Sequence, residues 1–518
     1  MILILVKWIL ILAFALACYL VNMFFLQPYL IRKKYGKYAN VGQSEDMQYI
    51  QGDLVDTNKN QVADKYLYWH YVEQWMKDNQ PDIYIKFLGH RPMFLFFSIQ
   101  ALEEMRQLQP VKIDRDNYFI DQFIGKIFPG SFAQKLSDDN WKERRNTSMR
   151  TLGINFASRY ISTLIEIIDN TVKTCEKGQE MDFTAVFSSI QFTFTCKMLF
   201  GKEFELSFRV LKYKNYKGEY EDVDMQTMMQ NLAMDTYMGL YDSIGKIFPF
   251  LNKYNLVEPY KRTQENIKEF RNALVEFLAS SKDEECYYAQ IKNTGKFTED
   301  EMVSDLLLML FAGSDTTSHA TASILYFLKK FPDEAEKCLS EYKKVGIITS
   351  NGLERDMLKM QKFEECEYSE YFIKEMFRLD HTAPETVSYQ TLQDVVICGV
   401  PIDKGNICSI SLTGMHYDKR EYYKPLEFMP ERFDPESEYF TSPKTGKSRS
   451  PLSFIPFSTG IRNCPGQTMA RLIQRVTMPY FMSVIDYEVD KDLLNNDKAL
   501  FNNTSQYHLK IKITEINI

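Results

Sequence analysis

The stretch that decides the fold is Phe457-Ser-Thr-Gly-Ile-Arg-Asn-Cys-Pro-Gly466. Its two glycines, Gly460 and Gly466, permit backbone turns that other residues resist. Cys464 stands just before a helical pattern that runs from Gln467 to Met482. Backbone N–H groups at the start of a helix stabilise a thiolate. The stretch therefore predicts either a cysteine held as a thiolate or a buried cysteine in a glycine-rich turn.

The rest of the chain has the composition of a folded protein. Of its 518 residues, 45% are hydrophobic and 25% are charged, which excludes a disordered chain. The 69 acidic residues outnumber the 62 basic ones, a balance opposite to that of proteins that wrap nucleic acid. The nine cysteines include no CxxC pair, so neither a zinc site nor a disulfide framework is indicated. We therefore expect a reducing compartment and free thiols.

A long helix is predicted upstream of the cysteine stretch. Thr298-Glu-Asp-Glu301 forms a capping box, and the helical pattern continues to about Lys330. At 1.5 Å per residue such a helix spans ~50 Å, enough to cross the molecule. Its middle reads Ala312-Gly-Ser-Asp-Thr-Thr317. By themselves, Asp315 and Thr316 are typical of the polar face of a core helix.

Three shorter patterns place charged side chains at helical spacing. They are Glu375-Met-Phe-Arg378, Pro430-Glu-Arg-Phe433 and Trp141-Lys-Glu-Arg-Arg145. Residues three or four apart share one face of a helix, so the glutamate and arginine of the first pattern are neighbours, as are the tryptophan and last arginine of the third. Taken singly, such patterns are typical of solvated ion pairs at a helix surface.

Together and in this order, the five patterns resemble those of the cytochrome P-450 family: WxxxR, [AG]GxD[TS], ExxR, PERF and FxxGxRxCxG. The resemblance extends from the N-terminus to about residue 510. It implies a mainly α fold with a small β part, a cytochrome P-450-like single catalytic domain plus an N-terminal transmembrane helix.

The resemblance also implies roles for particular residues. The cofactor is haem b (iron-protoporphyrin IX), and Cys464 supplies the axial thiolate to the iron. Asp315 and Thr316 are implied to be catalytic, as the groups that deliver protons to oxygen. The implied haem-binding residues are Trp141, Arg145, Ala312, Gly313, Phe457, Gly460, Arg462 and Gly466. A buried structural cluster of mutually paired charges is implied for Glu375, Arg378 and Arg432.

The N-terminus predicts a membrane anchor. Trp8 to Leu26 is almost wholly apolar and spans roughly 28 Å as a helix, about one hydrocarbon core. Four basic residues follow it between positions 32 and 37, whereas only Lys7 and the amino terminus precede it, which places the remaining chain in the cytosol. The alternative is a cleaved signal peptide, because Ala15-Leu-Ala17 has the A-x-A form. Apolar sequence continues beyond that point, which favours the anchor.

We therefore predict a transmembrane anchor over residues 1–30, a linker over 31–65 and a haem-thiolate catalytic domain over 66–518. The expected location is the endoplasmic reticulum membrane, crossed once, with the catalytic domain in the cytosol. No second stretch is predicted to span a membrane. Strands are expected at 82–88, at 92–98, between 395 and 413, and at 507–518.

The resemblance implies a monooxygenase that inserts one atom of O2 into a lipophilic organic substrate, with electrons from an NADPH-dependent flavoprotein reductase. No nucleic acid is expected as a partner. Two alternatives stay open: a haem-thiolate isomerase or dehydratase of peroxides, and a non-catalytic membrane haem-binding sensor. The isomerase needs no delivered protons, so Asp315 and Thr316 favour the monooxygenase. We expect the reductase to dock on a basic patch formed by Lys142, Arg144, Arg471 and Arg475.

The chain departs from the family pattern in three places. The family usually has Pro-Pro after ExxR, whereas Asp380-His-Thr-Ala-Pro384 has one proline. Tyr389-Gln390 stand where the family has a basic residue for a haem propionate. The proline-rich hinge after the anchor is reduced to Pro28. The substrate is not specified, although the aromatic residues Phe119, Phe123 and Phe128 suggest an apolar pocket.

Overall fold

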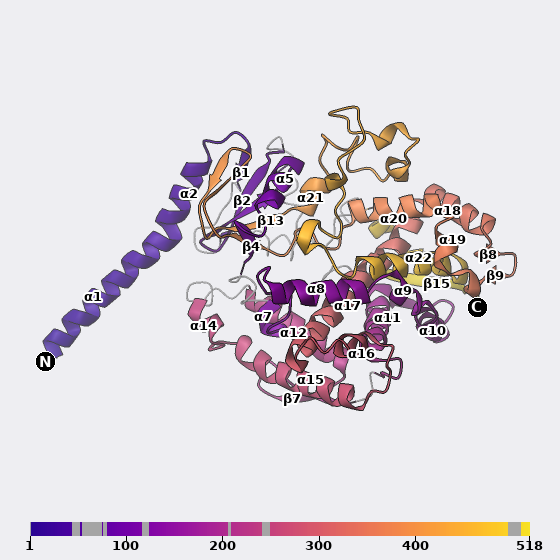
Figure 1. Cartoon of the computed structure of the whole chain (residues 1–518), viewed down its shortest axis with the longest axis horizontal. Helices are drawn as coiled ribbons and strands as arrows, with labels where there is room; N and C mark the ends of the chain where they lie inside the picture. Colours follow the sequence, from indigo (N-terminus) through magenta and orange to yellow (C-terminus); the bar gives the residue numbers. More distant parts are fainter. Residues whose placement is uncertain are drawn as a thin grey trace. The chain divides into compact units, whose positions relative to one another are not determined.

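The chain is described by a computed structural model over residues 2–43, 52–53, 75, 80–116, 124–205, 209–240, 249–495 and 509–517. Contacts within the chain divide it into two compact units. Unit 1 comprises Met1–Asp116 and Glu385–Met415, and unit 2 comprises Asn117–Pro384 and His416–Ile518. Most regular structure is helical, as predicted, with short strands in both units (Figure 1). The predicted boundaries of anchor, linker and catalytic domain stay a prediction.

Unit 1 is built on a six-stranded sheet. Its order is β1 (Val41–Gln43), β2 (Ile83–Leu88), β3 (Arg91–Phe96), β13 (Ile407–Ile410), β10 (Tyr389–Thr391) and β4 (Ile113–Arg115). Strands β2 and β3 form the predicted hairpin, in which Gly89 takes the positive φ of 64° that the turn requires. Strand β13 continues the sheet in parallel with β3. Three further elements lie between or after these strands in the chain. Helix α5 (Ile99–Leu108) follows β3, the hairpin β11 (Val395–Ile397)–β12 (Val400–Ile402) lies between β10 and β13, and helix α21 (Leu412–His416) follows β13.

The N-terminal segment is continuous helix. Helix α1 (Ile2–Val21) passes through a π-helical turn, η1 (Asn22–Leu26), into α2 (Gln27–Tyr35). Ile4–Tyr35 is long enough to cross a membrane. Its most apolar 18 residues have a mean hydropathy of 2.5, and only 11% of them are buried within the protein. A second helix, α11 (Phe183–Phe200), also passes this test of composition. Because 61% of it is buried, α11 is a core helix. Its apolar residues pack inside the protein, whereas those of Ile4–Tyr35 are mostly exposed.

Unit 2 is a helical assembly around α17 (Glu299–Lys330), which packs against α11, α22, α20, α16 and α15 (Figure 1). The helices before α17 are α7 (Ile124–Ile127), α8 (Asp139–Thr151), α9 (Ile154–Ser158), α10 (Ile161–Val172), α11, α12 (Met225–Leu240), α14 (Pro249–Lys253), α15 (Tyr260–Ser280) and α16 (Tyr287–Lys292). Those after it are α18 (Pro332–Lys344), α19 (Met360–Phe363), α20 (Glu367–Leu379), α22 (Gln467–Val484) and α23 (Lys491–Leu494).

The strands of unit 2 are short. A three-stranded sheet joins β14 (Ile485–Val489), β15 (Lys510–Ile516) and β5 (Glu180–Asp182), and β15 confirms the strand predicted for the C-terminal tail. Two hairpins, β6 (Leu211–Lys214) with β7 (Tyr220–Val223) and β8 (Ile348–Thr349) with β9 (Gly352–Leu353), complete the described strands of this unit. Between α21 and α22 the chain is irregular and its helical elements are short 3-10 turns.

Candidate active site

Helix α17 begins at the predicted capping box. The Thr298 hydroxyl accepts a hydrogen bond from the Glu301 N–H, and the Glu301 carboxylate accepts one from the Thr298 N–H. Most of the helix is buried on all sides, from Met302 to Leu310 and again from Thr317 to Leu328. Between these stretches a short segment has accessible side chains, and this interruption marks the candidate site.

The accessible segment contains the expected catalytic pair. Ala312 and Asp315 are exposed and share one face of α17, since they are three residues apart. Thr316 is half-buried, and its hydroxyl donates a 2.7 Å hydrogen bond to the Ala312 carbonyl. Gly313 lies toward α11, because a Cβ atom there would be 3.5 Å from Thr195 Cγ2.

Asp315 has an unusual electrostatic setting. Its side chain has accessible surface, yet protein surrounds it on most sides. The loss of bulk water penalises the carboxylate and raises the pKa of Asp315, an effect that His319 opposes. A carboxyl group with a raised pKa keeps its proton to a higher pH than an ordinary aspartate does, and accessible surface lets it exchange that proton.

The cysteine stretch forms a tight loop ahead of α22. Gly460 has a φ of 71°, and the Cys464 N–H donates a 2.9 Å hydrogen bond to the Phe457 carbonyl, which closes the loop. Gly466 is the N-cap of α22, and a Cβ atom there would lie 3.8 Å from Cys464 Sγ. Gly460 therefore supplies the turn of the loop, whereas the backbone and surroundings of Gly466 would also accept a Cβ atom.

The Cys464 thiol feels opposing influences. Burial raises its pKa, whereas the backbone N–H groups of Gly466 and Gln467 and the charge of Arg145 lower it. The N–H groups belong to the start of α22, so the helix supplies the thiolate-stabilising donors that the sequence predicts. A cation bound to the sulfur would favour the thiolate further.

Three further expected haem contacts gather beside this loop. Trp141 and Arg145 lie on α8, which begins where the Asp138 carboxylate accepts a hydrogen bond from the Trp141 N–H. The Arg462 guanidinium carbon is 3.9 Å from the centre of the Trp141 indole ring, and that of Arg145 is 5.9 Å from it. Two cations therefore flank one indole, which is a suitable setting for a carboxylate-bearing ligand.

Backbone oxygens hold both guanidinium groups in this arrangement. Arg462 Nη2 donates to the Lys135 carbonyl at 2.7 Å and to the Ser137 hydroxyl at 2.8 Å. Arg145 Nη2 donates to the Asn463 carbonyl at 2.6 Å. The acceptors in these hydrogen bonds are uncharged.

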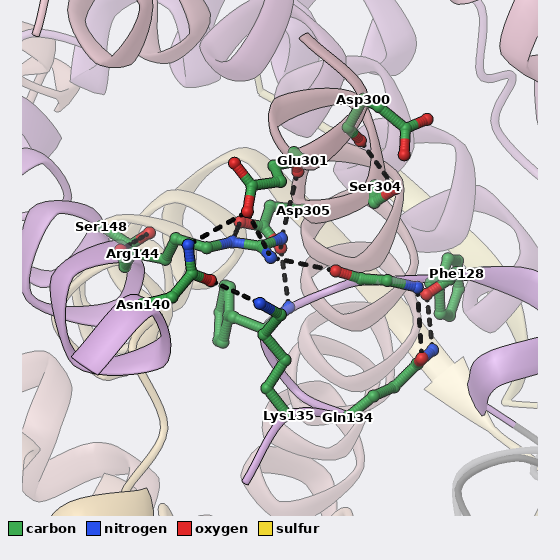
Figure 2. Close-up of polar contacts among 12 residues, drawn as sticks. Phe128, Gln134, Lys135, Asn140, Arg144, Ser148, Asp300, Glu301, Ser304 and Asp305 are labelled. Carbon is green, nitrogen blue, oxygen red and sulfur yellow. Dashed lines mark hydrogen bonds and ion pairs between the residues drawn. The ribbon is translucent and has the colours of Figure 1, made fainter. Parts of the chain in front are cut away.

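An ion pair that the sequence did not predict ties α8 to α17 (Figure 2). Arg144 Nε donates to Asp305 Oδ2 at 2.8 Å and Arg144 Nη2 to Asp305 Oδ1 at 2.5 Å, so the pair is bidentate. The Phe132 N–H donates to the same carboxylate at 2.8 Å, and Arg144 also donates to the Gly130 carbonyl. The pair thereby fixes α8 and residues 130–132 against α17.

This pair corrects one expectation. Arg144 was expected in an exposed basic patch, but its side chain is only 1% exposed, because it forms a buried ion pair with Asp305. Burial raises the pKa of Asp305 to about 6 despite the neighbouring guanidinium. Arg475 pairs with Glu370 at 2.9 Å, and Lys142 pairs with Asp139 at 3.2 Å.

The structure brings Glu375, Arg378 and Arg432 into one fully buried cluster. Glu375 Oε2 accepts from Arg378 Nε at 2.8 Å, and Oε1 accepts from Arg432 Nε at 3.1 Å. Arg378 also donates to the His416 and Pro425 carbonyls, and the Met429 N–H donates to Glu375. The cluster therefore pins the irregular chain before the cysteine loop to helix α20.

Two expectations concern other parts of the chain. In unit 1, Tyr389 on β10 pairs with Arg115 on β4, whose guanidinium carbon is 4.8 Å from the Tyr389 ring centre. A basic side chain thus lies beside Tyr389, supplied by a strand that is distant in sequence. In unit 2, Phe128 is buried against Phe311 on α17, with ring centres 5.4 Å apart. Phe119 and Phe123 lie outside the described residues.

The residues of this site fit a haem group. Cys464 offers a sulfur at a helix start, Arg145 and Arg462 offer positive charge for two propionates, and α17 offers an accessible face. Helix α22 packs against α17, and Gln474 Nε2 donates to the Thr321 hydroxyl at 3.3 Å. Loop and central helix are therefore anchored to each other within unit 2.

Comparisons with known proteins agree with this geometry. Residues 62–511 match the cytochrome P450 family. The chain is 38% identical over 170 residues to rat cytochrome P450 4F6, a match that covers 31% of this chain and 28% of the rat protein. It is 33% identical over 206 residues to leukotriene-B4 omega-hydroxylase 3 of Mus musculus (39% and 35% coverage). A fruit-fly relative, probable cytochrome P450 4ac3 of Drosophila melanogaster, is 24% identical over 406 residues and covers 74% of each chain.

The matches to the rat and mouse relatives thus span only about a third of those proteins. Among solved structures, retinoic acid bound cyanobacterial CYP120A1 has a TM-score of 0.65 at 17% identity, over 90% of this chain and 96% of that chain. This likeness confirms the predicted fold. The family match covers most of the sequence and includes the cysteine loop, α17 and α20. The chain therefore belongs to the cytochrome P450 family, whose cofactor is haem b held by a cysteine thiolate.

Proposed function

We propose that this chain is a membrane-anchored haem-thiolate monooxygenase that inserts one atom of O2 into a lipophilic organic substrate. The observation that carries this proposal is the pairing of two features in unit 2. One is Cys464 at the start of α22, and the other is the accessible face of α17 that bears Asp315 and Thr316. A haem protein that only bound or sensed a ligand would not need the acid and the hydroxyl.

Haem supplies the redox chemistry that activates dioxygen when it is bound. Cys464 is the proposed iron ligand, and the N–H groups of Gly466 and Gln467 steady the charge on its sulfur. Phe457 and Gly460 shape the loop around that sulfur, because the Phe457 carbonyl accepts from the Cys464 N–H and Gly460 supplies the turn.

The propionates of haem are proposed to bind Trp141, Arg145 and Arg462. The indole N–H is a donor, and the two guanidinium groups beside the indole ring supply positive charge. Ala312 would contribute space on the accessible face, since its side chain ends at Cβ, whereas Gly313 lies toward α11. Glu375, Arg378 and Arg432 have a structural role, which is to hold the loop in register with α20.

Asp315 and Thr316 are the proposed proton-handling groups. Burial raises the pKa of the Asp315 carboxyl, which favours its protonated form, and the carboxyl lies on the accessible side of α17. The Thr316 hydroxyl donates a hydrogen bond to the Ala312 carbonyl. Its oxygen is therefore oriented to accept a hydrogen bond from a group in the site. Asp315 is therefore the proposed proton donor, and Thr316 is the proposed hydrogen-bond acceptor that orients the group in the site.

The substrate class is proposed from the relatives. One of them is named a leukotriene-B4 omega-hydroxylase, so a long-chain lipid acid is the first substrate to test. Phe311, which is half-buried beside the accessible segment of α17 and packs on the buried Phe128, gives this region the apolar character that such a substrate requires. Substrate-induced shifts of the haem absorption, screened over fatty acids, sterols and unrelated lipophilic compounds, would identify the class.

Location and redox partner complete the proposal. The apolar helix Ile4–Tyr35 anchors the chain once in the endoplasmic reticulum membrane, and the basic residues after α1 keep the rest in the cytosol. Electrons come from an NADPH-dependent flavoprotein reductase. Asn146 starts a glycosylation sequon on exposed helix surface, so its lack of glycan in a eukaryotic host tests the cytosolic placement.

The deciding experiment uses the full chain reconstituted with haem and reductase. The reduced-CO difference spectrum should show the thiolate signature, and Cys464→Ser should abolish it. NADPH-dependent oxygen consumption should rise with a substrate. If the wild type binds haem with a thiolate but rearranges peroxides without consuming oxygen, it is the isomerase or dehydratase. If it turns over neither, it is a haem-binding sensor.

A further inference from the structure

The loop between α7 and α8, residues 128–138, holds the guanidinium group of Arg462. Arg462 Nη2 donates a 2.7 Å hydrogen bond to the Lys135 carbonyl and a 2.8 Å hydrogen bond to the Ser137 hydroxyl. The same guanidinium lies over the Trp141 indole, with its central carbon 3.9 Å from the ring centre. The position of the α7–α8 loop therefore influences where Arg462 places its positive charge.

A buried ion pair fixes the first half of this loop to α17 (Figure 2). The Phe132 N–H donates to Asp305 Oδ1 at 2.8 Å, and the Gly130 carbonyl accepts from Arg144 Nη1 at 3.0 Å. Arg144 and Asp305 are joined to each other by two hydrogen bonds. One carboxylate and one guanidinium thus hold a backbone donor and a backbone acceptor of the same loop.

Hydrogen bonds inside the loop join this fixed half to the half that holds Arg462. Gln134 Nε2 donates to the Phe128 carbonyl at 2.5 Å, and Gln134 Oε1 accepts from the Gly130 N–H at 3.2 Å. Gln134 directly precedes Lys135, whose carbonyl accepts from Arg462. A shift of the loop at Gly130 is therefore transmitted toward Arg462, because tightly bonded segments move together.

Stability by itself is a weak reason for a charged pair at this place. Burial raises the pKa of Asp305 to about 6 although Arg144 and the Phe132 N–H lower it, so the carboxylate is held against a cost of desolvation. Apolar side chains of similar volume often replace a buried ion pair without loss of stability. Such side chains could not bond to the backbone of the loop, and this is what the ion pair provides.

We propose that Arg144 and Asp305 are positioning residues for a haem propionate, and that they act through the α7–α8 loop and Arg462. This role rests on the proposed function of Arg462, which is to bind that propionate. Arg144 donates its own hydrogen bonds to Asp305, Gly130 and Glu301. Substitution of the pair should therefore change how the protein holds haem through the movement of Arg462.

The first test measures how fast the full-length ferric holoprotein, without substrate or reductase, loses haem to an excess of apomyoglobin. Arg462→Met gives the reference increase in that rate. Arg144→Met should lose haem several-fold faster than wild type. Arg144→Met/Asp305→Leu should do the same even where it regains stability, because neither new side chain can bond to Gly130 or Phe132.

Arg271→Met is the matched control, because Arg271 also pairs with an aspartate on α17. It joins α15 to that helix through Asp300 and through a 3.0 Å hydrogen bond to the Ser304 hydroxyl. Arg271→Met thus removes a guanidinium from the same end of α17 and leaves the contacts of the α7–α8 loop in place. Its rate of haem loss should stay near that of wild type.

The second test uses resonance Raman spectra of the ferric holoproteins, in which the propionate bending bands respond to hydrogen bonds on the propionates. Arg144→Met/Asp305→Leu should shift these bands in the same direction as Arg462→Met. Combined with Arg462→Met, it should add little to the band shift or to the rate of haem loss, because both changes act on one contact. An ion pair that served stability alone would leave the bands unchanged once stability is regained.

The outcomes separate the positioning role from the function on which it rests. If Arg462→Met changes neither haem loss nor the bands, the proposed function of Arg462 fails, and the positioning role fails with it. If Arg462→Met changes both but Arg144→Met/Asp305→Leu behaves as wild type, the positioning role is overturned and the function of Arg462 stands.

The combined variant decides the route. If the effects of Arg144→Met/Asp305→Leu and Arg462→Met add in full, the route through Arg462 is overturned. If neither Arg144 variant binds haem, Asp305→Asn replaces them in both measurements. It keeps the shape of the side chain and an acceptor for the Phe132 N–H, and it should give smaller changes in the same directions. A wild-type result for Asp305→Asn would then overturn the proposal.

Discussion

Glu375 and Asp315 are acids in the same unit, and their surroundings differ. Glu375 is fully buried and accepts hydrogen bonds from two guanidinium groups and one backbone N–H. Asp315 has accessible surface and, as its main electrostatic neighbour, a histidine one turn away. Burial lowers the pKa of Arg432 to about 10, which still leaves that partner of Glu375 charged at pH 7.

The difference shows two uses of a buried carboxyl group. A carboxylate enclosed by permanent cations is part of a fixed network of ion pairs, so its role is structural. A carboxyl group beside a titratable neighbour can change its protonation at little cost, so it can handle protons. Substitution of Glu375 should therefore change the free energy of unfolding strongly and proton-coupled turnover weakly. Substitution of Asp315 should change proton-coupled turnover strongly and the free energy of unfolding weakly.

The largest effect on stability is expected for Glu375→Gln. It leaves Arg378 and Arg432 buried without a carboxylate, which should lower the free energy of unfolding by about 3–5 kcal/mol. Glu370→Gln on the same helix is the matched control, since Glu370 pairs with Arg475 nearer the surface and should cost below about 1 kcal/mol. Urea unfolding followed by circular dichroism measures both. Equal losses in the two variants would remove the basis of the comparison.

Arg144→Met should come next, with a loss of about 3 kcal/mol, because it leaves Asp305 buried without its bidentate partner. Lys142→Met, two residues away and exposed, should cost less than about 0.5 kcal/mol. The double variant Arg144→Met/Asp305→Leu should recover part of the loss, since it leaves no unpaired charge. A double variant that is less stable than Arg144→Met would contradict the explanation that the loss comes from an unpaired buried charge.

His381 provides a buried group kept neutral. Burial lowers its pKa from 6.5 to about 4, so between these values the unfolded chain binds the proton more tightly than the folded chain. The contribution of His381 to the free energy of unfolding is therefore complete above pH 6.5. It falls by up to about 3 kcal/mol as the pH drops toward and below 4. Stability measured at pH 7.5 and 4.5 should differ less in His381→Gln than in wild type. An unchanged difference would show that other groups set the acid limb.

Thr298→Ala should have a smaller effect, about 1 kcal/mol, because it removes the hydroxyl of the capping box at the exposed start of α17. Thr298→Ser keeps that hydroxyl and serves as the control. Thermal unfolding of the two variants measures the difference. Loss of the thiolate signature in Thr298→Ala would indicate that the end of α17 is coupled to the site.

The smallest effect on stability is expected for Asp315→Asn. The amide has nearly the shape of the carboxyl group and needs no charged partner, so the free energy of unfolding should change by less than about 0.5 kcal/mol. Product formation should fall by about 10²-fold, because the variant cannot donate a proton. Unfolding and coupled turnover are measured on the same preparation. A large loss of stability with intact coupling would reverse the comparison with Glu375.

Features set by neighbouring residues could be predicted from the sequence. The capping box, the bounds of α17, the β2–β3 hairpin and the helix after Cys464 each depend on contacts between residues a few positions apart. Composition and length alone do not separate α11 from a spanning helix, and it is the burial of α11 in the core of unit 2 that makes the distinction. Spacing also placed Arg144 on the surface, because nothing near it in sequence indicates Asp305.

The sequence by itself determined the family and the chemistry of the cysteine loop, since five spaced motifs and one helix start are local properties. Only the tertiary structure decided which charges are paired. His319 meets Asp380 across 61 positions, Glu375 meets Arg432 across 57, and Arg144 meets Asp305 across 161. Hydrogen bonds act over about 3 Å, so partners this far apart in the chain are fixed by how the helices pack, which motif spacing does not encode.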